Sequence, residues 1–310
     1  MPMMARTGRG WPEMCAPASD PTPQAIRAAS RFPECCDPRE ILDLTGRKGL
    51  VVGIANDRSL AWPAAMHFRQ AGAELAVTHV NDRTIPHVAP LAARLEAPIF
   101  MPCDVAVPGE LETVYGAIAE QWGRLDFVLH AVGAERPEDL HGRLTDCSAE
   151  GFAEAMTVSV HSFIRMARLA EPLMAKGGSL ITLSYLGAER VVEHYNMMGP
   201  VKAALEASVR YLAHELGPQG IRVNAVSAGP VATRAASGLT GFQSLLAESA
   251  RIAPLRRAIE ADEVGRTALL LASDYTSAVT GEVLHVDAGV HVEAPGAPQS
   301  GGPRANPHPR

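Results

Sequence analysis

Short apolar runs alternate with longer segments of helical periodicity along most of this chain, and that alternation restricts the folds open to it. The apolar runs, which we expect to be strands, fall near residues 49–54, 74–79, 97–102, 126–132, 178–184, 221–227 and 283–287. Helical patterns fall near 61–71, 108–122, 148–174, 196–216 and 262–273. Repeated strand-helix-strand units build a parallel sheet covered by helices on both faces. The sequence therefore predicts an α/β fold, a doubly wound parallel sheet in a Rossmann-like single domain with disordered termini.

The two ends of the chain differ from the part between them. Residues 1–40 carry Pro, Gly, Arg and Ser without helical or strand periodicity, and residues 294–310 are low in complexity and lack core-forming side chains. We expect a disordered leader over 1–40, one domain over 41–293 and a disordered tail over 294–310. Acidic residues in the leader argue against an organelle transit peptide.

Charge and composition narrow the range of partners. The 310 residues carry a formal net charge of -6, which gives no general attraction to nucleic acid or to an anionic membrane surface. No apolar run approaches the roughly 18 residues of a membrane span, and no secretory signal opens the chain. The five cysteines form no C-x-x-C pair, which argues against a zinc site. We expect a cytoplasmic protein without a nucleic acid, membrane or metal partner.

Two phenols and an ammonium lie close together in the second half of the chain. Tyr185 follows the fifth apolar run, and Tyr195 precedes Lys202 by seven positions, a spacing that places both near one helix face. Hydride delivery to a carbon conjugated with a carbonyl leaves negative charge on the oxygen, which needs a proton donor. A tyrosine supplies one, and a nearby ammonium is expected to lower its pKa. Taken alone, a packing tyrosine and a solvated lysine are the simpler interpretation.

The end of the first apolar run has the features of a pyrophosphate seat. It closes with Gly53, and a loop leads through Ser59 to the start of a helix, where free amides and the helix dipole favour an anion. The strict G-x-G-x-x-G pattern is absent. Ser59 is expected to cap the helix and to bind a phosphate oxygen, although a plain capping serine fits the local sequence equally well.

Later strand ends add to this nucleotide site. Asp104 follows the third run, where a carboxylate accepts from an adenine amino group, although aspartate is also a common turn former. Gly133 follows the fourth run and lets a cofactor pass close to the backbone. No acidic residue stands at the tip of the second run, and the nearest certain cation, Arg83, is several residues on. These features favour NADH over NADPH.

Together these motifs resemble the NADH-dependent enoyl-[acyl-carrier-protein] reductases of bacterial fatty-acid synthesis, in the short-chain dehydrogenase/reductase superfamily. The resemblance covers residues 44 to 292. It rests on the loop from Gly53 to Ser59, the run 183–190, the six residues between Tyr195 and Lys202, and the segments 222–230 and 281–287. The wider superfamily separates its tyrosine and lysine by three residues, so the longer spacing is typical of the enoyl reductases.

The resemblance implies roles for particular residues. Tyr195 would donate to the thioester carbonyl of a trans-2-enoyl chain, Lys202 would hold the nicotinamide ribose, and Tyr185 would line the acyl pocket. NADH would contact Lys202 and a set of residues at the strand ends: Gly53, Ser59, Leu60, Asp104, Val105, Gly133, Val231 and Thr233. The segment from 232 to about 250 corresponds to a mobile substrate-binding loop. Acyl carrier protein would be the partner, and the assembly a homotetramer.

Two departures from the family pattern predict consequences. Pro200 stands between Tyr195 and Lys202; a proline inside a helix costs about 3 kcal/mol, less in a first turn, and could shift the geometry of the pair. The sequence Ala-Glu-Arg at 134–136 replaces a more apolar run and predicts a changed substrate range. Two alternatives therefore stay open. One is a related reductase acting on another enone or a ketone, and the other is an NAD-binding paralogue with impaired catalysis.

Overall fold

The computed structural model of the protein describes residues 42–136, 138–139, 142–233 and 241–293. The predicted leader over 1–40 and the predicted tail over 294–310 lie outside these residues, so their disorder and the domain bounds 41–293 stay predictions. In the described part, no helix combines the length and the apolar character needed to cross a membrane.

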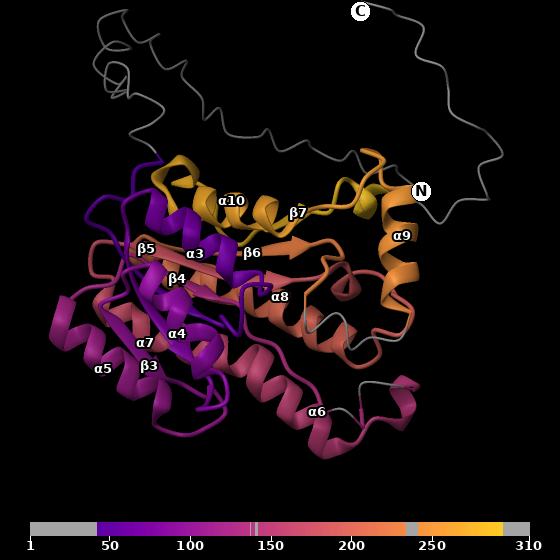
Figure 1. The fold of residues 1–310 in the computed structure, drawn as a ribbon, viewed down its shortest axis with the longest axis horizontal. Coiled ribbons are helices and arrows are strands. Elements are labelled where there is room, and N and C mark those ends of the chain that lie inside the picture. The colour runs from indigo at the N-terminus through magenta and orange to yellow at the C-terminus, as the bar shows by residue number, and fades with distance from the viewer. Residues whose placement is uncertain (1–41, 137, 140–141, 234–240, 294–310) are drawn as a thin grey trace, which may run out of the picture. The chain divides into compact units, whose positions relative to one another are not determined.

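A seven-stranded sheet forms the centre of the described domain (Figure 1). Its strands lie in the order β3-β2-β1-β4-β5-β6-β7, and every neighbouring pair is parallel. The bounds are β1 (Lys48–Val52), β2 (Glu74–His79), β3 (Ile99–Pro102), β4 (Phe127–His130), β5 (Gly178–Ser184), β6 (Ile221–Ala228) and β7 (Val283–Val286). The order reverses between β1 and β4, where doubly wound sheets bind ligands beyond their carboxyl ends. The predicted fold class is confirmed.

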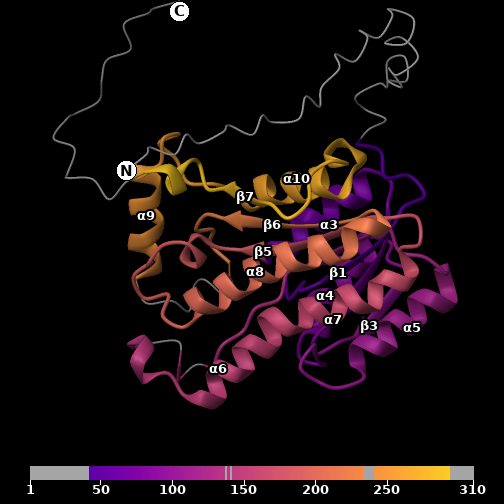
Figure 2. The same ribbon diagram turned by 180° about the vertical axis from the view of Figure 1, so that it is seen from behind.

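Helices cover both faces of this sheet (Figures 1 and 2). One apolar core lies under α3 (Ala61–Gln70), α4 (Ile85–Arg94) and α10 (Ala261–Ala272). The other lies under α5 (Glu110–Trp122), α7 (Ser162–Ala170) and α8 (Met198–Leu216). Along β1 the side chains alternate between the two, since Leu50 and Val52 belong to one core and Val51 to the other. Burial on both faces explains why the strands are continuous apolar runs.

Three helical segments differ from the sequence prediction. Helix α4 was not expected, because Pro86 and Pro90 interrupt its pattern; Pro86 lies in the first turn, where proline is tolerated. The single helix expected over 148–174 consists of α6 (Ala149–Met156), a π-helical turn at Thr157–His161, and α7. Helix α9 (Phe242–Ile252) lies in the segment expected to be a substrate loop, of which residues 234–240 are outside the described part.

Candidate active site

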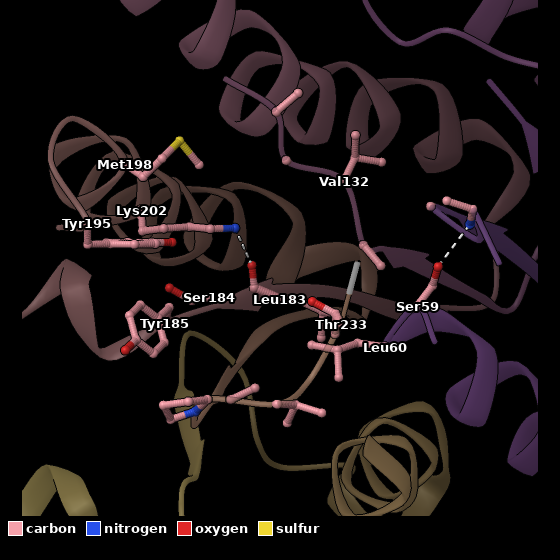
Figure 3. A pocket seen from close by; sticks show the side chains of 18 of the residues that line it. Ser59, Leu60, Val132, Leu183, Ser184, Tyr185, Tyr195, Met198, Lys202 and Thr233 are labelled. Carbon is pink, nitrogen blue, oxygen red and sulfur yellow. Dashed lines mark hydrogen bonds between the residues drawn. The ribbon is translucent and has the colours of Figure 1, made fainter. Parts of the chain in front are cut away.

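A cavity of about 600 Å³ opens at the carboxyl ends of β1, β4, β5 and β6 (Figure 3). Its volume is in the range of small-molecule and cofactor sites. Most of the site residues predicted from the sequence line it together: Gly53, Ser59, Leu60, Gly133, Tyr185, Tyr195, Lys202, Val231 and Thr233. The fold therefore gathers into one place residues that are up to 180 positions apart in the chain.

Lys202 projects from α8 into the cavity and is buried. Its Nζ donates a hydrogen bond of 2.8 Å to the backbone carbonyl oxygen of Leu183 on β5 (Figure 3). Burial lowers the pKa of Lys202 to about 8, against the opposing effect of the Glu206 carboxylate one turn further along α8. The lysine thus stays mostly an ammonium at neutral pH, with two of its three N–H donors left for other acceptors.

Tyr195 lies in a turn before α8, which begins at Met198. The prediction that Tyr195 and Lys202 share a helix face is therefore wrong. The turn has left-handed backbone at His194 (φ 65°) and Asn196 (φ 44°), a conformation that asparagine tolerates better than most residues. The Asn196 side chain donates to the carbonyl oxygen of Asp139, 3.0 Å away, and fixes the turn against the loop after β4. This turn, and not helical periodicity, positions the Tyr195 ring beside Lys202 in the cavity (Figure 3).

The pKa of Tyr195 moves in the direction opposite to the sequence prediction. Burial of the hydroxyl raises it, and the nearby charges of Tyr185, Glu135 and Glu206 raise it further. Tyr185 packs edge-on against Tyr195, with ring centroids 4.7 Å apart, and burial raises its pKa to about 12. Both phenols are therefore neutral near pH 7, the form that donates a hydrogen bond.

Pro200 does not disturb this geometry. Because α8 begins at Met198, Pro200 occupies its first turn, where the backbone N–H has no acceptor within the helix. The next amide, of Val201, donates to the carbonyl of Met197 at 3.2 Å. The full cost of a proline inside a helix therefore does not apply, because the proline precedes the hydrogen-bonded part of the helix.

Gly53 ends β1 in a conformation that requires glycine. Its φ is 117°, and a Cβ there would lie 2.2 Å from the carbonyl oxygen of Ala131. The amide of Ala131 in turn donates to Val52 at 2.9 Å, so the ends of β1 and β4 are held in close contact. The exposed backbone and the cavity beside it leave room for a flat ligand crossing the strand ends, as a dinucleotide does.

Ser59 closes the loop after β1 and does not cap α3. Its Oγ accepts hydrogen bonds from the amides of Ala55 (3.0 Å) and Asn56 (3.1 Å), and the N-cap residue of α3 is Leu60, without a side-chain cap (Figure 3). The predicted capping role is wrong. The Ser59 hydroxyl keeps its own proton for a ligand, which suits a pyrophosphate oxygen. In the first turn of α3, the Trp62 amide already donates to the Ser59 carbonyl at 2.9 Å and Pro63 has no N–H, so this turn offers few free amides.

Asp104 and Val105 are not among the residues that line the cavity. They follow β3 at the edge of the sheet, where the Asp104 carboxylate accepts from the amide of Ala106 at 2.9 Å. The Val105 side chain is buried in the core. This geometry is that of a turn-forming aspartate, and a contact of either residue with an adenine stays a prediction.

Two carboxylates of the site were not among the predicted site residues, although Glu135 belongs to the run at 134–136 that the sequence analysis linked to the substrate range. Ser184 donates to Glu206, whose pKa is raised by burial. Glu135 lines the cavity, and burial, followed by the charge of Asp139, raises its pKa to about 7. Glu206 was detectable from its position four residues after Lys202 on a helix. No local pattern in the sequence indicates that the Glu135 side chain lines the cavity.

A buried histidine supports the strands beneath the cavity. His130 ends β4, with Nδ1 2.8 Å from Oγ1 of Thr182 and Nε2 2.8 Å from Oγ of Ser162. Because Ser162 gives its own proton to the carbonyl of Val158, its oxygen accepts from Nε2, and Nδ1 accepts from Thr182. Burial, with the charge of Lys202, lowers the pKa of His130 to about 3. The ring is neutral and joins β4, β5 and the start of α7.

A family model described as Enoyl-(Acyl carrier protein) reductase matches residues 53–291. Enoyl-[acyl-carrier-protein] reductase [NADH] 1 of Rhizobium meliloti is 48% identical, over 80% of this chain and 91% of its own length. The corresponding Nostoc protein is 46% identical, over 81% of this chain and 99% of its own. A crystal structure of the Anaplasma phagocytophilum reductase in complex with NAD has a TM-score of 0.78 at 48% identity, and the match covers 82% of this chain and 96% of that one.

Proposed function

This chain belongs to the enoyl-[acyl-carrier-protein] reductase family of the short-chain dehydrogenase/reductase superfamily, and we propose that Tyr195, Lys202 and Tyr185 carry out its reaction. The enzyme is an NADH-dependent oxidoreductase of fatty-acid synthesis that saturates the C2–C3 double bond of a trans-2-enoyl thioester. The assignment of these residues depends on one observation. The neutral hydroxyl of Tyr195 and the hydrogen-bonded ammonium of Lys202 lie in the same cavity as the Gly53 turn at the end of β1.

Tyr195 is the proposed proton donor. Bound NADH supplies the hydride that adds to C3 of the enoyl chain. Negative charge then develops on the thioester carbonyl oxygen, and the neutral Tyr195 hydroxyl donates to it from a buried position, where such a hydrogen bond is strong. The enolate then takes up a proton from water at C2, so that one hydride and one proton have added across the double bond. Tyr185 packs against Tyr195 and limits the motion of the Tyr195 ring. It is also proposed to line the part of the cavity that takes the acyl chain.

Lys202 is proposed to hold the nicotinamide ribose. One of its N–H groups is committed to Leu183, and this bond aims the others into the cavity. Gly53, Ser59, Leu60, Gly133, Val231 and Thr233 are proposed to bind the rest of the cofactor. The glycine turn and the loop closed by Ser59 support the pyrophosphate part of this proposal.

Acyl carrier protein is the proposed carrier of the substrate, a homotetramer the proposed assembly, and the cytoplasm the proposed location. The family to which the chain belongs supports the first, and the other two stay predictions. The two alternatives of the sequence analysis are less well supported. An impaired paralogue depended on a distorted tyrosine-lysine pair, and Pro200 causes no such distortion.

The test is an assay of NADH oxidation with purified protein and crotonyl or longer enoyl thioesters, beside Tyr195→Phe. We expect turnover by the wild type and a loss of roughly 10²- to 10⁴-fold in kcat for the variant, the usual contribution of a positioned acid. Undiminished turnover in Tyr195→Phe would refute the role of the hydroxyl. Turnover with ketones alone would favour the other reductase, and NADH binding without any turnover would favour the impaired paralogue.

A further inference from the structure

Glu135 is the one carboxylate among the described residues that line the cavity. It stands two residues after Gly133, in the loop that leads away from β4. Its Oε2 is buried and has no hydrogen-bond partner in the described part of the chain. A buried carboxylate oxygen without a donor is unfavourable, so this position suits a donor from a bound molecule, since the described residues supply none.

The charged groups next to Glu135 are engaged elsewhere. Arg136 donates from Nε to Glu154 at 2.6 Å, so its guanidinium turns away from the neighbouring carboxylate. The Asp139 carboxylate accepts from the amide and the hydroxyl of Ser148, both at 2.7 Å. The carbonyl of Asp139 holds Asn196, next to Tyr195. The loop is thus fastened on two sides, and among the described residues the Glu135 carboxylate forms no ion pair.

The cavity that Glu135 shares with Tyr195 indicates which part of a substrate supplies the missing hydrogen-bond donor. Glu135 and Tyr195 line the same cavity. An enoyl substrate that places its carbonyl oxygen at Tyr195 offers no donor along its hydrocarbon tail. On the other side of the sulfur, two methylene groups lead to an amide N–H, which the carrier-protein arm and coenzyme A share as part of their pantetheine unit.

We propose that Glu135 is a specificity-determining residue that accepts a hydrogen bond from the amide N–H of the substrate's pantetheine arm. The inference rests on the proposed function, since it places the thioester carbonyl at Tyr195. It deepens that function by assigning the recognition of the thioester arm to a residue that lines the cavity.

The test compares two thioesters that differ in the arm alone, crotonyl-pantetheine and the S-ethyl thioester of crotonic acid, which has no amide. For Glu135→Ala we expect kcat/KM to fall about tenfold with crotonyl-pantetheine and to stay unchanged with the ethyl thioester. Glu135→Gln keeps an acceptor oxygen and is expected to retain most of the activity on the pantetheine substrate. Glu154→Ala, an exposed carboxylate bound to the same loop, is the matched control and should preserve the wild-type ratio of the two substrates.

If Glu135→Ala lost the same factor in kcat/KM on both thioesters, or lost none on either, the inference would be overturned, because the effect of the substitution would then not depend on the arm. Unchanged NADH binding by Glu135→Ala would show that the variant is folded. A wild-type protein that turned over neither thioester would refute the proposed function, and the inference with it. Wild-type turnover without an arm-dependent loss would refute the role of Glu135 alone.

Discussion

The ammonium of Lys202 donates to the backbone carbonyl oxygen of Leu183, 2.8 Å away, and this bond joins α8 to β5. The next residue on β5, Ser184, donates to Glu206 on the following turn of α8. Helix and strand are therefore tied twice beside the cavity. The ties fix the direction of the lysine before a cofactor binds, which lowers the entropic cost of using it.

Removal of the ammonium should weaken cofactor binding. For Lys202→Met we expect the Kd for NADH to rise roughly tenfold to hundredfold, since hydrogen bonds from charged groups contribute about 1.5–3 kcal/mol. Fluorescence titration with NADH measures this change. Lys176→Met, which removes an exposed lysine, is the control and should bind as the wild type does. An unchanged Kd in Lys202→Met would contradict the assignment of the ribose contact.

A side chain at residue 53 should be incompatible with the turn after β1. Gly53→Ala places a Cβ 2.2 Å from the carbonyl oxygen of Ala131 at a φ of 117°. We expect a loss of at least about 1–3 kcal/mol in the free energy of unfolding, together with weaker NADH binding. Gly116→Ala, in an open position inside α5, should instead stabilise by about 0.5–1 kcal/mol. Urea denaturation measures the free energy of unfolding of both variants. Equal changes in Gly53→Ala and Gly116→Ala would contradict the prediction.

Pro200 should be nearly neutral for stability and activity. It lies in the first turn of α8 and is exposed, so we expect Pro200→Ala to change the free energy of unfolding by less than about 1 kcal/mol. Arg210→Pro, at an exposed position in the middle of the same helix, should cost about 3 kcal/mol. Thermal denaturation and the NADH assay check both variants. A large gain in kcat for Pro200→Ala would show that the proline does distort the pair.

Acid should destabilise the fold through His130. Burial lowers its pKa from 6.5 to about 3, so the unfolded chain takes up a proton between these values and the folded protein does not. The neutral ring's stabilisation is complete above pH 6.5 and is lost by about 1.4 kcal/mol per unit as the pH falls towards 3. Urea unfolding at pH 6.5 and 4.5 should show this slope in the wild type and in His87→Gln, an exposed control, and a smaller slope in His130→Gln. Equal pH dependence of the free energy of unfolding in all three proteins would refute the role of His130 in acid destabilisation.

The sheet and its ligand edge were predictable because they depend on patterns within short segments. The strands of a doubly wound sheet are buried on both faces, so they appear as apolar runs, and the predicted runs include most of the observed strand residues. Helix α4 escaped prediction because two prolines masked its period, and the helix expected over 148–174 contains a π-helical turn that no local pattern announces.

Local sequence patterns were enough to predict the fold class and the residues that meet at the ends of β1, β4, β5 and β6, because parallel strands bring their carboxyl ends to one edge. How these residues behave depends on their packing. The raised pKa of Tyr195, the bond from Lys202 to Leu183 and the Glu135 oxygen without a partner among the described residues all depend on burial and on neighbours distant in the chain. Desolvation and hydrogen bonding act through space, so their outcome is set by packing and not by spacing along the sequence.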